Sequence, residues 1–150
     1  MESPKRQLRT LTLDQITTRV KERFGPGKDR EFFREVERRQ WFPGSQVRPK
    51  AWIVDDGQSR VTNAADKDGG EEFQQKYKII LDLRDNWERE QPFIDWTDRV
   101  QEIVLHLLNW LPTTGVIDHK YEDDEPFDAI LASGAVQSIW IISFVVHRFE

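Results

Sequence analysis

Residues 137–149, QSIWIISFVVHRF, form the stretch around which the rest of this chain has to be arranged. Apolar side chains occupy both alternating sets of positions: Ile139, Ile141, Val145 and Phe149 in one set, and Trp140, Ile142, Phe144 and Val146 in the other. β-Branched and aromatic residues dominate and no helix breaker intervenes, so the stretch predicts a long strand, central in its sheet, with two apolar faces. Helices of the same chain can cover one face, whereas the other face requires a second layer or a neighbouring subunit.

Composition limits the classes of protein to which the chain can belong. Its length of 150 residues suits one domain, residues 1–150, with one core. The 22 basic and 27 acidic residues give a formal net charge of −5, which argues against a protein that coats nucleic acid by neutralising phosphates. There is no cysteine, and no apolar segment follows the start MESPKRQLRT, so we expect no thiolate chemistry, no signal peptide, and folding in the cytoplasm.

The N-terminal third predicts one clear helix. Thr12 and Gln15 have the spacing of a capping box, and apolar residues then recur at helical intervals until a glycine-proline turn at 25–27. Residues 1–10 are expected to form a flexible arm before this helix. Between 29 and 40, charged residues surround three apolar ones, a pattern that favours a short surface helix.

The middle of the chain predicts a long β-hairpin. The sequence AWIV at 51–54 reads as a short strand that runs into a turn signal. From 71 to 87 most odd positions are apolar and most even positions are polar, which is the period of a strand with one buried face. The intervening residues 56–70 are polar and contain little that could pack, so we expect a mobile loop at the tip of the hairpin.

The C-terminal half completes the predicted fold. Asp95 can cap a helix whose apolar stripe continues from Trp96 until Pro112 closes the helix. The sequence VIDHKY at 116–121 predicts a strand, and 122–126 an acidic loop. The elements together favour the α+β class, with a four-stranded, mostly antiparallel sheet and two main amphipathic helices packed on one face.

One group of residues has an enzyme-like pattern. Asp118 and Lys120 on one strand, with Asp82 and Asp85 on another, provide the residue types of a metal-dependent nuclease of the PD-(D/E)xK kind, in which carboxylates hold the metal and lysine stabilises phosphate charge. The spacing is loose, and short motifs of this kind are common by chance. The sequence favours the solvated face of edge strands instead, where charge opposes edge pairing.

The remaining polar clusters also predict structural roles. His119 with the acids at 122–125 offers ligands for a hard cation, but without the spacing of an ion-binding loop. The basic residues at 34, 38 and 39 have acidic neighbours, which indicates a salt-bridged surface. There is no nucleophile elbow and no glycine-rich phosphate loop. We therefore expect no catalytic residue, bound metal or cofactor.

Four segments resemble one known family. They are LTLDQITTRVKERF at 11–24, FQQKYKIILDLRDNW at 73–87, DWTDRVQEIVLHLLNW at 95–110 and ILASGAVQSIWIISFVVHRF at 130–149. Their order and character are similar to those of the tail terminator, or tail completion, proteins of long-tailed bacteriophages, which are small α/β subunits that assemble as hexameric rings. The segment from Phe32 to Pro43, within the insertion at 28–44, has no counterpart in that pattern.

The resemblance implies a structural virion protein and not an enzyme. A ring of such subunits would cap the tail tube, end tube polymerisation and join the tail to the head-completion proteins of the neck. DNA would pass through the lumen without specific binding, and no membrane would be involved. The protein would be located in the virion, at the head–tail junction, after assembly in the host cytoplasm.

Three surfaces are predicted for that role. The tube-contact loop is predicted to include Asp56, Gly57, Arg60, Asp66, Lys67 and Asp68. Subunit interfaces are expected at Trp41, Phe42, Trp52, Trp140 and Phe144. A surface facing solvent or the lumen is expected at Glu122, Asp123, Asp124 and Glu125.

Two alternatives remain open from the sequence. Another neck component, such as a head-completion or connector protein, would share the oligomeric habit but bind the portal side. A small metal-dependent nuclease is the enzyme alternative, and it depends on Asp118.

Overall fold

The computed structural model describes residues 7–40, 47–61, 71–83, 90–130 and 136–149. The elements follow the order α1 (Leu8–Phe24), β1 (Glu35–Arg38), β2 (Lys50–Val61), β3 (Glu72–Leu83), α2 (Glu90–Leu108), β4 (Val116–Ile130) and β5 (Val136–Phe149). Neither helix, over its described residues, is long and apolar enough to cross a membrane. The α+β class predicted from the sequence is confirmed.

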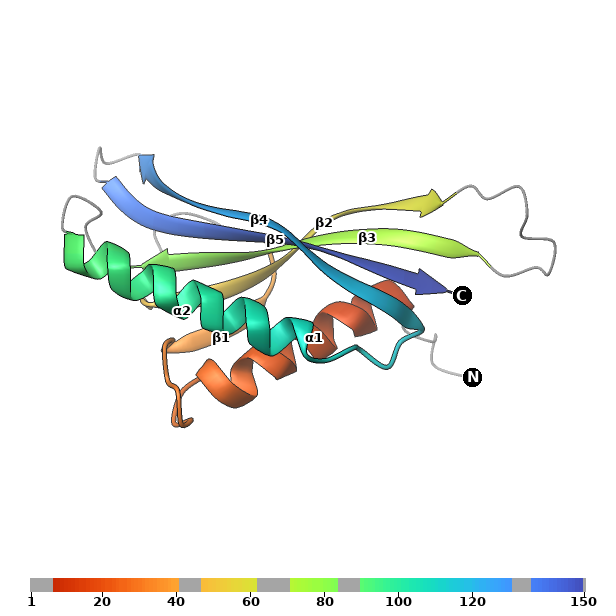
Figure 1. Cartoon of the computed structure of the whole chain (residues 1–150), viewed down its shortest axis with the longest axis horizontal. Helices are drawn as coiled ribbons and strands as arrows, with labels where there is room; N and C mark the ends of the chain where they lie inside the picture. The colour runs from red at the N-terminus through yellow and green to blue at the C-terminus, as the bar shows by residue number, and fades with distance from the viewer. Residues whose placement is uncertain (1–6, 41–46, 62–70, 84–89, 131–135, 150) are drawn as a thin grey trace, which may run out of the picture.

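The described strands form one sheet in the order β1-β2-β3-β5-β4 (Figure 1). β1 pairs with β2 in parallel, and all other neighbours are antiparallel. The sheet is therefore five-stranded and mixed, and the prediction of four strands missed β1. β5 lies between β3 and β4, which confirms that the apolar C-terminal strand is an interior one.

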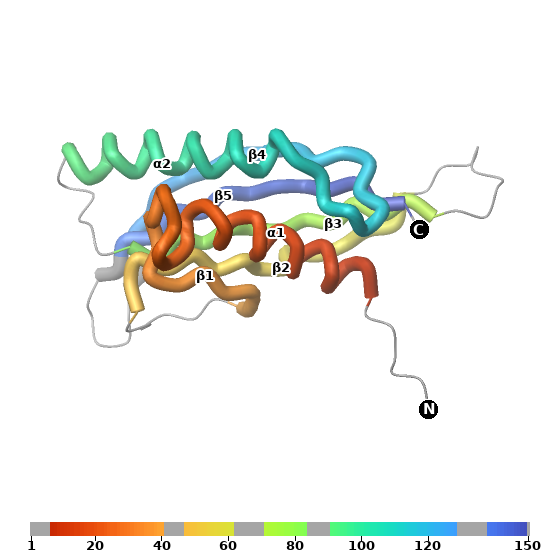
Figure 2. The backbone as a smooth tube through the Cα atoms, turned by 90° about the horizontal axis from the view of Figure 1, so that it is seen from below, coloured from red at the N-terminus to blue at the C-terminus, as the bar shows by residue number. Residues whose placement is uncertain are grey.

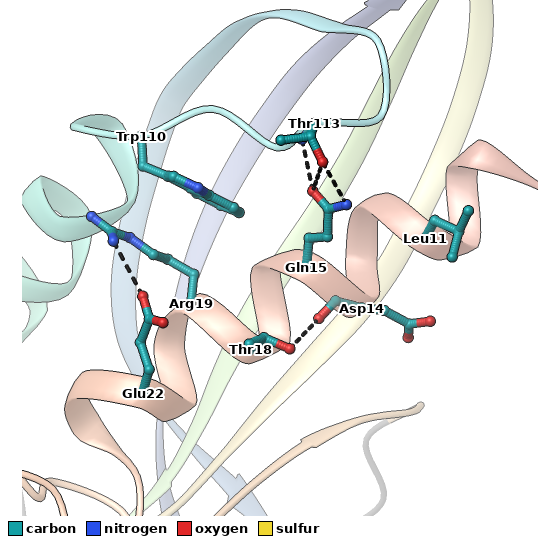
Figure 3. Close-up of a pocket in the computed structure, with 8 residues that line it drawn as sticks. All are labelled: Leu11, Asp14, Gln15, Thr18, Arg19, Glu22, Trp110 and Thr113. Carbon is teal, nitrogen blue, oxygen red and sulfur yellow. Dashed lines mark hydrogen bonds and ion pairs between the residues drawn. The ribbon is translucent and has the colours of Figure 1, made fainter.

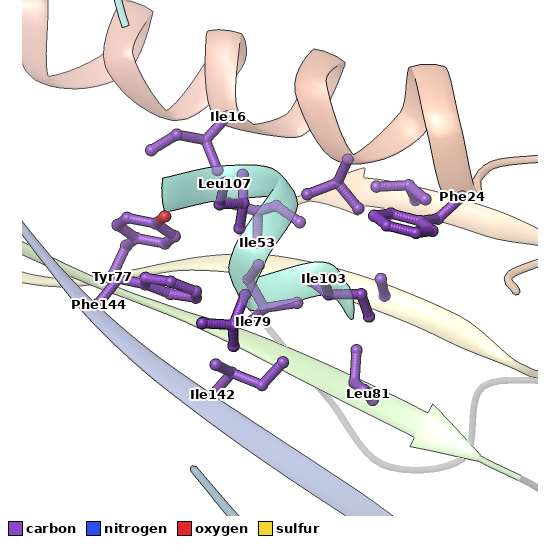
Figure 4. Packing of buried hydrophobic residues seen from close by; sticks show 14 of the residues in the cluster. Ile16, Phe24, Ile53, Tyr77, Ile79, Leu81, Ile103, Leu107, Ile142 and Phe144 are labelled. Carbon is purple, nitrogen blue, oxygen red and sulfur yellow. The ribbon is translucent and has the colours of Figure 1, made fainter. Parts of the chain in front are cut away.

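The main core lies between the sheet and the two helices (Figure 4). Even positions of β5, including Ile142 and Phe144, point into this core, as do odd positions of β3, including Tyr77 and Ile79. Helix α1 contributes Ile16 and further residues of its apolar stripe. Helix-period and strand-period burial thus coincide on one face of the sheet, as the sequence patterns predicted.

Both helices cover the same face of the sheet (Figures 1 and 2). Helix α1 packs against β1 and β2, whereas α2 packs against β4. The opposite face carries a smaller buried cluster of Trp52, Val54, Ile80 and Ile139, with Ile141 beside it. No described helix lies over that face (Figure 1).

The prediction of a short helix at 29–40 is wrong. Phe32 stacks on Phe24 with ring centroids 4.9 Å apart, and Phe33 stacks on Trp96 at 5.9 Å. These contacts tie the segment to both helices, and the following residues Glu35–Arg38 then run alongside β2. The strand depends on a partner distant in sequence, so the local charge pattern could not reveal it.

The prediction of an acidic loop at 122–126 is also wrong. β4 continues through these residues and pairs with β5 along its length, with register shifts between Val116 and Asp118 and between Tyr121 and Asp123. The shifts act as β-bulges that let the strand bend and continue. Because β4 is the outermost strand, its charged side chains remain in solvent while its backbone is paired.

The start of α1 and the end of β2 differ from the predictions, and α2 begins at Glu90, ahead of the predicted cap Asp95. Helix α1 begins at Leu8, so the end of the expected arm at 1–10 is helical, and residues 1–6 lie outside the described residues. β2 continues to Val61, so the start of the expected loop at 56–70 is paired strand, and 62–70 lie outside the described residues. A bulge after Asp55 places Gly57 at φ +108°, a conformation that favours glycine.

Candidate functional surfaces

The outer half of the β2–β3 hairpin is anchored to α1 by a partly buried polar cluster. Arg9 donates two hydrogen bonds of 2.7 Å to the carboxylate of Asp55, which also accepts one of 2.9 Å from the backbone N–H of Gly57. Burial raises the pKa of Asp55, but the bonds from Arg9 and Gly57 outweigh it, and the pKa is below its ordinary value. The helix thus fixes the bulge from which the hairpin continues.

Arg148 of β5 extends this cluster into the sheet. Its side chain is 1% exposed, and its guanidinium donates to the amide oxygens of Gln75 and, at 2.7 Å, Gln58. Gln75 in turn donates to the backbone carbonyl of Arg9 at 3.0 Å. The sequence analysis missed this cluster. The alternation along β5 could have predicted it, because Arg148 occupies an even position and therefore lies on the same face as the buried Ile142 and Phe144.

The predicted tube-contact residues fall into two groups. Asp56, Gly57 and Arg60 belong to β2, where Asp56 pairs with Lys78 at 3.7 Å and Arg60 with Glu71 at 3.0 Å. Asp66, Lys67 and Asp68 lie outside the described residues.

The predicted acidic surface lies in the middle of β4, at the edge of the sheet. Glu122, Asp123 and Glu125 are exposed, and within the described chain their side chains have no hydrogen-bond or ion-pair partner. Asp124 is different, because it accepts hydrogen bonds from Trp140 Nε1 at 2.8 Å and from the hydroxyl of Tyr121. Partial burial and the Asp124 carboxylate raise the pKa of Tyr121 to about 12. The exposed acids thus have carboxylates available for a partner.

Three of the five predicted interface aromatics are buried inside the chain itself. Trp52 and Phe144 are 0% exposed and Trp140 is 3% exposed, so their side chains contribute little to the surface of one subunit. Lys50 Nζ lies 3.7 Å from the centroid of the Trp52 ring, and Phe144 stacks on Tyr77. Trp41 and Phe42 lie outside the described residues.

The residues of the proposed nuclease motif do not converge. Asp82 is level with Phe127 of β4, whereas Asp118 is level with Gln74 of β3. The eight-residue offset corresponds to roughly 26 Å at the rise of a strand. Asp82 is buried and pairs with Arg48 at 3.2 Å, while Asp118 pairs with Lys120 at 3.4 Å. Asp85 lies outside the described residues.

His119 and the acids at 122–125, the possible ligands of a cation, also point in different directions. His119 turns into the core, where its Nε2 lies 2.6 Å from the hydroxyl of Tyr77, whereas Glu122 and Asp123 point into solvent. Among the described residues, no group of three histidine or carboxylate side chains has an arrangement that could hold a metal ion.

One cleft lies between α1 and the connection from α2 to β4 (Figure 3). It has a volume of about 450 Å³. The side-chain amide of Gln15 forms hydrogen bonds with Thr113. The guanidinium of Arg19 donates a hydrogen bond to the backbone carbonyl of His106 and lies over the Trp110 ring. The polar groups around the cleft thus hold the two helices together, which indicates a structural role.

The comparisons with known proteins leave the family open. No protein-family model matches the chain, and no curated protein is found as a relative. The chain belongs to the α+β class, because it has a mixed sheet with both helices on one face.

Proposed function

We propose that this chain is a structural subunit of a ring that caps the tail tube of a long-tailed bacteriophage, ends tube polymerisation and joins the tail to the neck. Support comes from the order of elements, in which a helix, a long hairpin, a second helix and a terminal pair of strands follow one another. The nuclease alternative loses its geometric basis, because Asp82 and Asp118 lie at opposite ends of the sheet.

The observation that carries the proposal is that the two sides of the subunit differ. Strands β1 and β4 form opposite edges of the sheet, and α1 accompanies β1 whereas α2 accompanies β4. A closed ring of identical subunits requires two different, complementary patches on each copy. A mixed sheet with unlike edges supplies such a pair of sides.

The hairpin is the proposed contact with the tube. β2 and β3 have 12 residues each, and their distal end projects beyond the N-terminal end of α1 in both views (Figures 1 and 2). The Arg9–Asp55 pair and the Arg148 cluster fix the middle and the outer half of the hairpin relative to α1 and β5. A partner would therefore meet a rigidly mounted arm, which limits the ordering cost of binding.

The test is to measure the mass of the purified protein by light scattering over a concentration series, with and without polymerising tail-tube protein. We expect a closed ring, or a monomer that becomes a ring on the tube, and tubes that stop growing. A monomer indifferent to the tube would overturn the proposal. A ring that binds portal-side components but ignores the tube would favour another neck component.

A variant with a shortened hairpin tests whether the hairpin makes the contact with the tube. Val61 and Glu72 face each other at the end of the β2–β3 ladder, so an Asn-Gly turn can replace residues 62–71 and close the strands. We expect this variant to form rings as the parent does but to leave tube growth unchecked. Capping at the parent's efficiency would move the tube contact to another surface.

A further inference from the structure

The net charge of the molecule is concentrated in one strand. β4 contains six carboxylates and one lysine, a formal charge of −5 that equals the net charge of the entire chain. The rest of the chain is therefore balanced, with 21 acidic and 21 basic residues. Glu122, Asp123 and Glu125 present this charge at the free edge of the described sheet.

The opposite side of the molecule presents cations. We define the basic flank as Lys21, Arg34, Arg38 and Arg39, at the β1 side of the sheet. Arg38 bonds Asp14 of α1, and Lys21 lies two helical turns after Asp14, on the same side of that helix.

The acids of that side are already bound within the chain. Asp14 pairs with Arg38, and Lys50 binds both Glu35 and Glu37. Lys21 and Arg34 are exposed and, in the part of the chain that the structure describes, have no carboxylate partner. The basic flank therefore retains positive charge that the subunit itself does not neutralise.

The two charged sides cannot neutralise each other within one subunit. Four strand spacings separate β1 from β4, which corresponds to roughly 19 Å across the sheet. This distance exceeds the screening length of about 8 Å at physiological ionic strength. Complementary charges on opposite sides of one chain meet only when two copies associate head to tail.

We propose that the acidic edge of β4, formed by Glu122, Asp123 and Glu125, docks on the basic flank of a second copy of this chain. This inference rests on the proposed ring function and specifies its subunit contact. Tyr121 and Phe127, which are 38% and 37% exposed, add apolar area beside the acids. The contact is made by side chains, because Pro126 has no N–H for backbone pairing along this edge.

Charge reversal tests the contact from both sides. One variant carries Asp123→Lys and Glu125→Lys, and the other carries Lys21→Glu and Arg34→Glu. All four side chains are exposed and lack a carboxylate or cation partner in the described chain, so the substitutions break no ion pair. Each variant alone should associate at least about tenfold more weakly than the parent at low salt, since like charges then face each other.

Restoration distinguishes a head-to-tail contact from a general charge effect. An equimolar mixture of the two variants should recover assemblies of the parent's mass, as should one chain that carries all four substitutions. Asp98→Lys, which removes an exposed carboxylate on α2, serves as the control and should leave association unchanged. Sedimentation velocity measures all of these, and 0.5 M salt should weaken association of the parent itself.

The outcomes separate this inference from the function on which it rests. Rings that form equally well from the parent and from both variants would overturn the contact and leave the tail-terminator proposal intact. Variants that lose association and do not recover it on mixing would also overturn the contact. A parent that stays monomeric with and without the tube would overturn the proposed function, and the contact with it.

Discussion

The buried pair of Tyr77 and His119 shows how single polar atoms join the sheet to α2. The hydroxyl of Tyr77 lies 2.6 Å from Nε2 of His119, while Nδ1 of His119 faces the backbone carbonyls of Leu107 and Trp110 without a hydrogen bond of good geometry. Burial raises the pKa of Tyr77 well above its ordinary value. The tautomer of His119 sets which of the two groups donates this hydrogen bond, since a neutral imidazole carries its proton on only one ring nitrogen.

Removing this hydroxyl should cost stability without disturbing packing. In Tyr77→Phe the ring can keep its stacking on Phe144, but Nε2 of His119 loses its hydrogen-bond partner in a buried site. We expect the free energy of unfolding to fall by about 1–2 kcal/mol in urea denaturation. Tyr121→Phe is the matched control, because that hydroxyl bonds Asp124 at the exposed edge and should cost less than about 0.5 kcal/mol. Equal losses in both variants would contradict a special role for the buried pair.

The same histidine should make stability depend on pH. Burial lowers the pKa of His119 in the folded protein, although Asp118 partly opposes this, and burial likewise lowers the pKa of His106. Unfolded histidine titrates near pH 6.5, so the unfolded chain takes up protons first as the pH falls. The stability present above pH 6.5 should therefore decline as the pH falls through the folded pKa. His119→Gln should show a shallower decline in denaturation midpoint between pH 7.5 and 5.5, and an unchanged slope would contradict this assignment.

At the level of elements, the sequence predicted those segments whose periodicity matches a buried face. The odd positions of β3 and the stripe of α1 lie in the core as their spacing indicated. β1 could not be predicted in this way, because Glu35–Arg38 has a mixed local pattern and is held by parallel pairing with β2. The acids of β4 look like a loop for a similar reason, since an edge strand exposes side chains that an interior strand would bury.

Local sequence patterns could not predict the polar cluster in the outer half of the hairpin, for another reason. Arg9, Asp55 and Arg148 are widely separated in the sequence, and the fold alone brings them together. Only the even-numbered position of Arg148 in β5 indicated that its side chain is buried. The sequence did not indicate that Gln58 and Gln75 are its hydrogen-bond partners. The sequence likewise could not show that Trp52 and Trp140, which are apolar enough for an interface, are buried within the chain.

Pro126 should keep the edge of β4 from pairing with other chains. The register from Asp123 to Ile130 is regular, so this part of the edge would otherwise be a template for a further strand. Pro126→Val adds an N–H and a β-branched side chain, and we expect faster aggregation, measured as light scattering over time at equal concentration. Ser143→Val on the interior strand β5 is the control and should aggregate at the parent's rate. A Pro126→Val variant that stays as soluble as the control would show that the acids alone protect the edge.

At the level of the whole molecule, one core joins all seven elements. It contains residues of both helices and of every strand of the described sheet, from Leu13 in α1 to Val146 in β5. Neither helix has a separate core, because α1 and α2 both cover the same face of the sheet. From this shared core we expect that no element is stable without the others.

The chain should therefore unfold in one cooperative transition. Ile16 in α1 and Leu107 in α2 are both 0% exposed, and truncating either to alanine should lower the free energy of unfolding by about 2–5 kcal/mol. Tryptophan fluorescence, which includes Trp52 on the other face of the sheet, and far-ultraviolet circular dichroism should give the same midpoint in the parent and in each variant. The measurements belong at a concentration where the chain is monomeric, because subunit contacts would add stability by mass action. Two separated transitions, with Leu107→Ala shifting only one of them, would mean that the β4–β5 side with α2 folds independently of the β1–β2 side with α1.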